Sequence, residues 1–190
     1  MSRRVGLLVL VVVLLLAGVV VALAVTARSP LQDGRDAVDG RWVPLRAPLA
    51  ARYDALGQVA SGLEAAAAGD RTYAVDLKDR LEEWNQLAKS ASPDAGSEAA
   101  VANQLEGLAT RVRTNIARSG RLSRDQNLSS AFTAFDAALV PPPAVTAYNR
   151  AVRKYERTRD ETLKRLPAKL LGFDTRPTLV IGPPPGVGAP

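Results

Sequence analysis

The 190-residue sequence contains no cysteine and no histidine. The chain therefore lacks the commonest general base, the thiol nucleophile and the usual zinc ligands. It also has no glycine-rich phosphate loop with a following lysine, and none of its five lysines lies in a Ser-x-x-Lys setting. We therefore expect no catalytic residues, no metal site and no cofactor, and we predict that the protein is not an enzyme. An enzyme with an unusual site would need converging buried carboxylates or a formed polar pocket.

Charge is absent from one long stretch near the start of the chain. Residues 5–25 are 21 consecutive uncharged residues, and sixteen of them are Leu or Val. As a helix this stretch covers roughly 30 Å, the thickness of a bilayer hydrocarbon core. Its Leu and Val residues favour insertion by on the order of 6 kcal/mol. We predict a short basic N-terminus at 1–4 and a transmembrane signal anchor at 5–27, which contacts membrane lipid.

Two alternatives remain open for this segment. Val25 and Ala27 have the spacing that a signal peptidase accepts, so the chain is alternatively a secreted bundle after cleavage. The compact cluster of Arg3 and Arg4 before the run favours an extracytoplasmic position for the rest of the chain. We therefore expect a single-pass plasma-membrane protein of the bacterial envelope, with its C-terminal domain outside.

The rest of the chain has the periodicity of helices, because apolar residues recur at steps of three and four. The first such stripe contains Pro44 and Pro48, so that helix either begins near Pro48 or is kinked there. Ser97 and Ser123 are candidate caps for later helices. A last helix is expected at about 145–166, after the triple proline at 141–143.

These stripes predict an all-α fold, an antiparallel bundle of about four helices preceded by the transmembrane helix. We place a linker at 28–40 and the bundle domain at 41–180. The final segment, 181–190, ends in Gly, Pro, Val and Ala only, so we expect a disordered tail there.

The last helix and the residues after it carry a motif. Its members are Tyr148-Asn149, Val152, Tyr155, Gly172-Phe173, Arg176 and Pro177. A second group follows the anchor: Val38, Trp42, Arg52, Asp54 and Leu56. In these positions the chain resembles the LemA family, as a divergent member in which Glu156 stands where the family repeats Asn after Tyr. The resemblance implies a membrane-anchored helical bundle whose biochemical role is undefined, and it implies no catalytic residues.

The candidate interaction residues lie on the last predicted helix. Asn149 is polar beside the apolar stripe and is a candidate for a specific contact. Arg153 and Arg157 belong to a basic surface that either forms salt bridges with neighbouring acids or contacts anionic groups. Arg159 falls on the inward stripe, so either its stem packs while its head reaches water, or a paired polar contact fixes the helix register.

Our leading hypothesis is a non-enzymatic scaffold or adaptor that binds another membrane or envelope protein. The alternative is a module that binds anionic lipid or an envelope polymer through the basic last helix. We expect no nucleic-acid partner, because no stacking aromatic platform accompanies the basic residues. A homo-oligomer is possible, since a stripe left exposed on one helix would pair with a second copy.

Overall fold

The computed structural model describes residues 3–90, 94–161, 168 and 171–182, with the backbone alone for residues 3–17 and 19–27. The described part is all-α, as predicted. Five α-helices and one 3-10 helix follow in the order α1 (Arg3–Ala65), α2 (Thr72–Ala88), α3 (Ala95–Arg118), η1 (Leu122–Arg124), α4 (Gln126–Ala137) and α5 (Pro142–Asp160).

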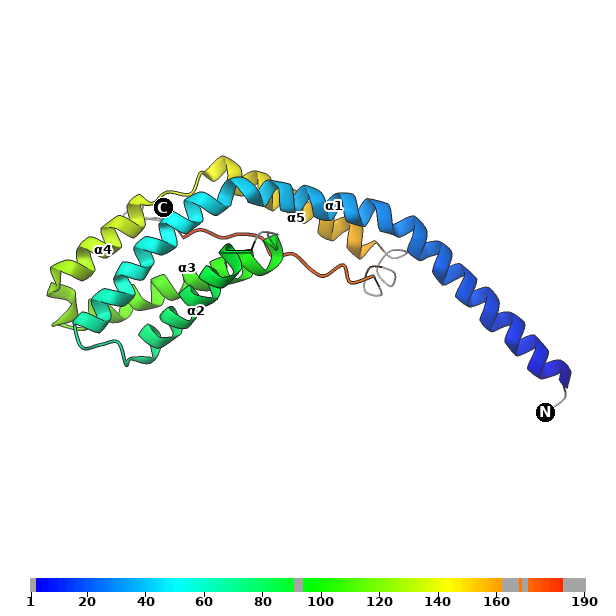
Figure 1. The fold of residues 1–190 in the computed structure, drawn as a ribbon, viewed down its shortest axis with the longest axis horizontal. Helices are drawn as coiled ribbons and strands as arrows, with labels where there is room; N and C mark the ends of the chain where they lie inside the picture. Colours follow the sequence, from blue (N-terminus) through cyan, green and yellow to red (C-terminus); the bar gives the residue numbers. More distant parts are fainter. Residues whose placement is uncertain (1–2, 91–93, 162–167, 169–170, 183–190) are drawn as a thin grey trace.

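The longest element, α1, is one continuous helix of 63 residues. Residues 28–40, which we expected to be a linker, are part of this helix, and their Leu31 and Val38 are fully buried. The prolines at 44 and 48 do not begin the helix but lie inside it, where α1 curves (Figure 1). The carbonyls that these prolines leave without an N–H donor belong to Gly40 and Pro44, which are exposed. Water can therefore satisfy both groups on the outer side of the bend.

The N-terminal part of α1 extends away from the other helices (Figure 1). Within the described residues, no helix is both long enough and apolar enough to cross a membrane. Apart from Gly18, the residues of the expected anchor at 5–27 are described by their backbone alone. The transmembrane helix therefore stays a prediction.

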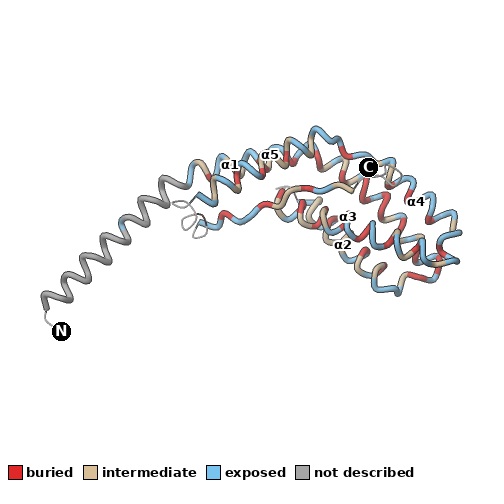
Figure 2. The backbone as a smooth tube through the Cα atoms, turned by 180° about the vertical axis from the view of Figure 1, so that it is seen from behind, coloured by how far each residue is buried: buried red, intermediate tan, exposed pale blue. Residues whose placement is uncertain are grey.

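The bundle is built around the second half of α1 (Figures 1 and 2). On one side α4 and α5 pack in succession along α1, and on the other α2 and α3 form a helical hairpin. The two helices α4 and α5 together occupy the fourth position of a four-helix arrangement. The triple proline at 141–143 separates them, because proline has no N–H with which to continue α4.

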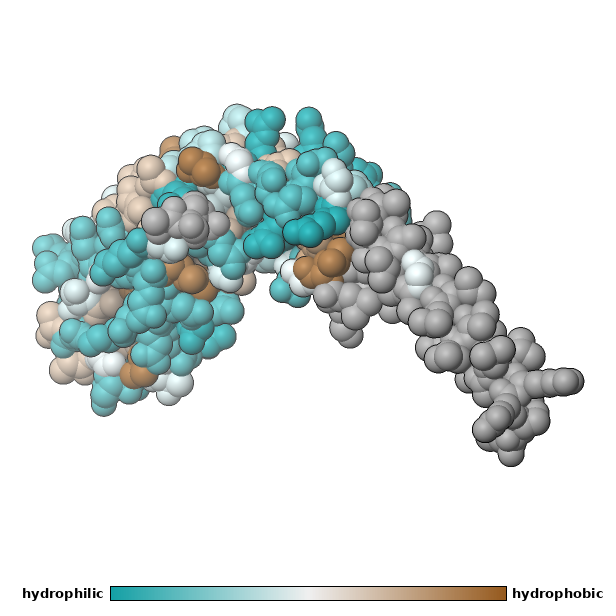
Figure 3. All heavy atoms as spheres, turned by 45° about the vertical axis from the view of Figure 1, so that its right-hand side comes forward, coloured by the Kyte–Doolittle hydropathy of each residue, from teal (hydrophilic) through white to brown (hydrophobic). Residues whose placement is uncertain are grey.

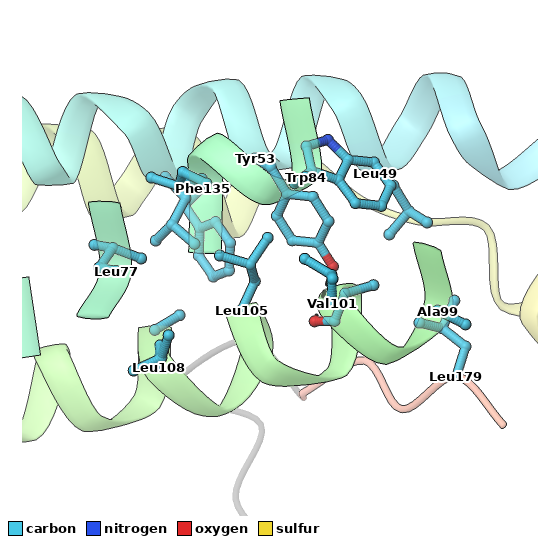
Figure 4. Packing of buried hydrophobic residues seen from close by; sticks show 14 of the residues in the cluster. Leu49, Tyr53, Leu77, Trp84, Ala99, Val101, Leu105, Leu108, Phe135 and Leu179 are labelled. Carbon is cyan, nitrogen blue, oxygen red and sulfur yellow. Dashed lines mark hydrogen bonds between the residues drawn. The ribbon is translucent and has the colours of Figure 1, made fainter. Parts of the chain in front are cut away.

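The core between these layers is apolar and aromatic (Figure 4). The rings of Tyr53 on α1 and Trp84 on α2 lie 4.8 Å apart in an edge-to-face arrangement, which favours a defined packing geometry. At the crossing of α1 and α4, a Cβ on Gly62 would lie 2.8 Å from a methyl carbon of Leu128. A larger residue would force the buried Leu128 side chain to shift, so Gly62 allows the two helices to approach closely here.

The helix starts differ from two of our expectations. Asp94, not Ser97, caps α3: its Oδ1 accepts from the Gly96 amide at 3.1 Å, and the Ser97 hydroxyl donates to its Oδ2 at 2.7 Å. Asp125, not Ser123, caps α4 by accepting from two backbone amides. A carboxylate is as good a cap as a hydroxyl and also suits the positive end of the helix dipole. The last helix ends at Asp160, and the predicted extension through 162–166 lies outside the described residues.

Candidate functional site

The most specific polar contacts in the described chain hold an extended segment. We call residues 173–182 the C-terminal strap; it runs between α3 and α5 (Figure 1). Its buried side chains are Phe173, Arg176 and Leu179. They recur every third residue, the repeat of a polyproline-II-like chain, and neither the helical nor the strand period. Ile181 and Gly182, which we assigned to the tail, belong to this strap.

Two asparagines hold the main chain of the strap from opposite sides. On α5, the Asn149 amide donates to the Leu179 carbonyl at 2.8 Å and accepts from the Leu179 amide at 2.7 Å. On α3, Asn103 donates to the Thr178 carbonyl at 2.7 Å and accepts from the Val180 amide at 2.8 Å. A carboxamide can bind an extended main chain in this way because it carries a donor and an acceptor side by side. The strap belongs to no helix or sheet, so the two side chains supply the hydrogen bonds of four of its backbone groups.

Three more side chains of α5 bind the strap. The hydroxyls of Tyr148 and Tyr155 donate to the carbonyls of Pro177 at 3.0 Å and Asp174 at 2.8 Å. Burial raises the pKa of both tyrosines, so they remain neutral donors at physiological pH. The Glu156 carboxylate accepts from the Arg176 amide at 2.6 Å. The face of α5 that points to the strap therefore recognises its main chain.

The Arg176 side chain is buried at the start of α3. It pairs with the capping carboxylate of Asp94, and its other nitrogen lies 3.7 Å from Asp39 on α1. Burial raises the pKa of Asp39, and Arg176 only partly counters that effect. For Asp94, burial is outweighed by hydrogen bonds from Ser97 and Arg176, so its pKa is lowered. Arg176 therefore links the strap, α1 and α3 by charge.

Two carboxylates of α3 are buried, and the first of them contacts the strap. Glu106 pairs with Arg52 through bonds of 2.6 and 3.0 Å, and it also accepts from the Gly182 amide at 3.3 Å. Arg52 further donates to the carbonyls of Phe135 and Ala138 and lies over the Phe135 ring. These contacts join α1, α3, α4 and the strap at one point.

The second carboxylate, Glu98, is fully buried and accepts from the Trp42 indole at 2.6 Å and from Arg46 at 3.0 Å. Glu98 and Glu106 are eight residues apart, about 12 Å along α3, so they do not converge on one point. Both are engaged by arginine. Within the described residues no group of three potential metal ligands is found.

Sequence reasoning missed both glutamates. The apolar stripe of α3 contains Val101 and Leu105, and Glu98 continues that stripe one turn earlier. Its position was therefore a usable signal. Glu106 lies beside the stripe, and only the Arg52 opposite explains why it is inside.

The four predicted interaction residues make different contacts in the structure. Asn149 makes a specific contact, but with the chain's own strap. Arg159 is paired within its own helix, with Glu156 at 3.0 Å and Asp160 at 2.9 Å. Glu156 thus binds Arg159 through one oxygen and the Arg176 amide through the other, and neither ion pair of Arg159 reaches another helix. Arg153 and Arg157 are exposed on α5, away from the strap contacts, and remain untested as interaction residues.

The described residues on the face drawn in Figure 3 are mostly hydrophilic, with small separate hydrophobic patches. One apolar groove of about 460 Å³ lies where α4 gives way to α5, beside the end of the strap. Leu139 and Val180 on its rim are 69% and 64% exposed, the highest values among the exposed large apolar side chains of the described residues. A second groove, of about 640 Å³, lies between α1 and α5 and has a basic rim.

No family model, curated protein or solved structure matches the chain. The resemblance to the LemA family therefore stays a prediction. The residues that carry it nevertheless meet in space: Tyr148, Asn149 and Tyr155 bind the strap that contains Arg176 and Pro177. The residues of this motif are thus the ones through which α5 binds the strap.

Proposed function

We propose that the chain is a single-pass plasma-membrane protein whose helical bundle is a non-enzymatic scaffold or adaptor for another membrane or envelope protein. The observation that carries the proposal is the continuity of α1. The helix that contains the uncharged run at 5–25 continues without interruption into the bundle, where Leu31, Val38 and Trp42 are fully buried. A bundle attached in this way has a fixed orientation relative to its anchor, which suits a scaffold.

The polar groups support a structural role in place of a catalytic one. Glu98 and Glu106 are bound by arginines, and the buried arginines Arg52 and Arg176 are bound by carboxylates. Groups held in this way contribute to the fold, although Oε1 of Glu98 is buried without a hydrogen-bond partner among the described residues. The exposed apolar groove beside Leu139 offers a surface for a protein partner, because such patches mark interaction sites.

The first test uses the absence of cysteine. Ser130 is exposed on α4, so a Ser130→Cys variant carries one reactive thiol in an otherwise thiol-free chain. We expect the full chain in the membrane fraction, resistant to carbonate extraction, and labelled in intact cells by a membrane-impermeant maleimide. Labelling only after lysis would place the bundle in the cytoplasm, and a shortened chain in the medium would establish secretion instead.

The second test addresses the partner. Affinity purification from detergent-solubilised membranes is compared between the full chain and Leu139→Asp. The matched control is Val75→Asp, the same change at an exposed apolar residue of α2. We expect a protein that is lost with Leu139→Asp and retained with Val75→Asp. Recovery of nothing above a chain that lacks residues 1–27 would refute the scaffold proposal.

A further inference from the structure

The groove between α1 and α5 is open and has a floor of small residues. Gly34 and Ala37 of α1 face Ala147 and Ala151 of α5. A Cβ on Gly34 would lie 3.1 Å from the Tyr155 ring, so the two helices approach closely here. Small side chains on both helices leave the groove of about 640 Å³ unfilled.

Three cations line this groove: Arg41 from α1, and Arg150 and Lys154 from α5. All three are exposed, and within the described part of the chain none of them has an ion-pair partner. Nearby arginines of the same helices, such as Arg46 and Arg159, are paired. Arg150 and Lys154 are four residues apart and repel one another. One carboxylate, Asp33, lines the groove as well and leaves a positive excess.

One end of the groove, at Pro30, is close to the expected membrane surface. The first residue of the groove, Pro30, lies five positions after Val25. The cation that α1 contributes, Arg41, lies sixteen positions after Val25. At 1.5 Å per residue these positions lie no more than about 8 and 24 Å beyond the apolar run. The headgroup layer accounts for about 5–8 Å of that distance. The Pro30 end of the groove therefore meets the headgroup layer and the Arg41 end lies beyond it, where long basic side chains shorten the remaining distance.

We propose that this groove binds the phosphodiester headgroup of an anionic phospholipid. The cations neutralise the phosphate, and the floor of glycine and alanine admits the glycerol portion of the headgroup. The inference rests on the proposed membrane location. It narrows the expectation of a lipid-binding basic last helix, because Arg150 and Lys154 of that helix line the groove and Arg153 and Arg157 do not.

The test uses the full chain purified in a neutral detergent. It is incubated at 0.15 M salt with equal amounts of dioleoyl phosphatidylglycerol and dioleoyl phosphatidylcholine, and retained lipid is measured by native mass spectrometry. Each basic residue near a lipid surface contributes about 1 kcal/mol, which is roughly a five-fold change in binding. The triple variant Arg41→Gln/Arg150→Gln/Lys154→Gln should therefore lose phosphatidylglycerol by on the order of 100-fold.

The matched control is Arg118→Gln/Arg121→Gln/Arg124→Gln, which removes three exposed cations at the opposite end of the bundle (Figure 1). It should retain the lipid. Ala151→Leu fills the groove without a change of charge and should weaken binding as well. Equal loss in both triple variants, or displacement of the lipid by an equal concentration of inorganic phosphate, would overturn the inference. Failure of the membrane location appears separately, as extraction of the chain by carbonate.

Discussion

Replacing Asn149 with alanine removes both hydrogen bonds between α5 and the main chain of Leu179. Each such bond contributes about 1 kcal/mol net, and an unsatisfied partly buried partner adds to the loss. We expect the free energy of unfolding to fall by about 2–3 kcal/mol. For a domain of this size that corresponds to a decrease in Tm of roughly 5–10 °C.

The assay follows from the core. Trp42 and Trp84 are almost fully buried on two different helices, so tryptophan fluorescence reports unfolding of the bundle in the detergent-solubilised full chain. Hydrogen exchange of the Leu179 and Val180 amides reports the strap itself, because both donate to asparagine side chains. Asn127→Ala, an exposed asparagine of α4, is the matched control and should change neither quantity.

A second substitution tests whether the strap detaches as one unit. Asn103→Ala alone should resemble Asn149→Ala, since it also removes two main-chain bonds. The double variant should lose less than the sum of the two, because a detached strap has no further bonds to lose. Unchanged Tm and unchanged exchange of Leu179 in Asn149→Ala would refute the reasoning, and strict additivity would refute detachment as a unit.

Three further outcomes are expected from thermal or urea unfolding of the same preparation. Arg52→Met should cost about 3–5 kcal/mol, since it leaves a buried carboxylate unpaired, and addition of Glu106→Leu should restore part of that loss. Asp94→Asn should lower the Tm at pH 7 by roughly 1–3 °C, the effect of a partly exposed ion pair. Because the folded-state pKa of Asp94 lies below its usual 3.8, its contribution is present above that pH and is lost as the pH falls below it, so the two curves should converge in acid. Gly62→Ala should destabilise by about 1–3 kcal/mol through overpacking against α4, whereas Gly57→Ala, with open space around it, should be neutral or stabilising.

The helices were predictable because burial of one face imposes a period on the sequence. Tyr148, Val152 and Tyr155 are spaced for the inward face of a helix, and all three are buried. The course of α1 through Pro44 and Pro48 was not predictable from that rule. It depends on the exposure of the carbonyls that lose their donors, a property of the folded chain.

The candidate site was predictable only in part. Asn149 stands out as a polar residue beside an apolar stripe, but its partner is a backbone thirty residues away and has no side-chain signature. The strap has the wrong period for a helix or a strand, so pattern analysis assigned it no structure. The sequence around Arg176 does not indicate that it is buried, because its partners Asp94 and Asp39 lie far away in the chain.

The position of the strap in the chain gives the bundle an order of assembly. During synthesis α3 and α5 leave the ribosome before residues 173–182, so Asn103 and Asn149 have no strap to bind until that segment has been made. The strap then binds between α3 and α5, after both helices have been made. A chain that ended at residue 172 would keep the five α-helices and lack the segment that joins α3 to α5.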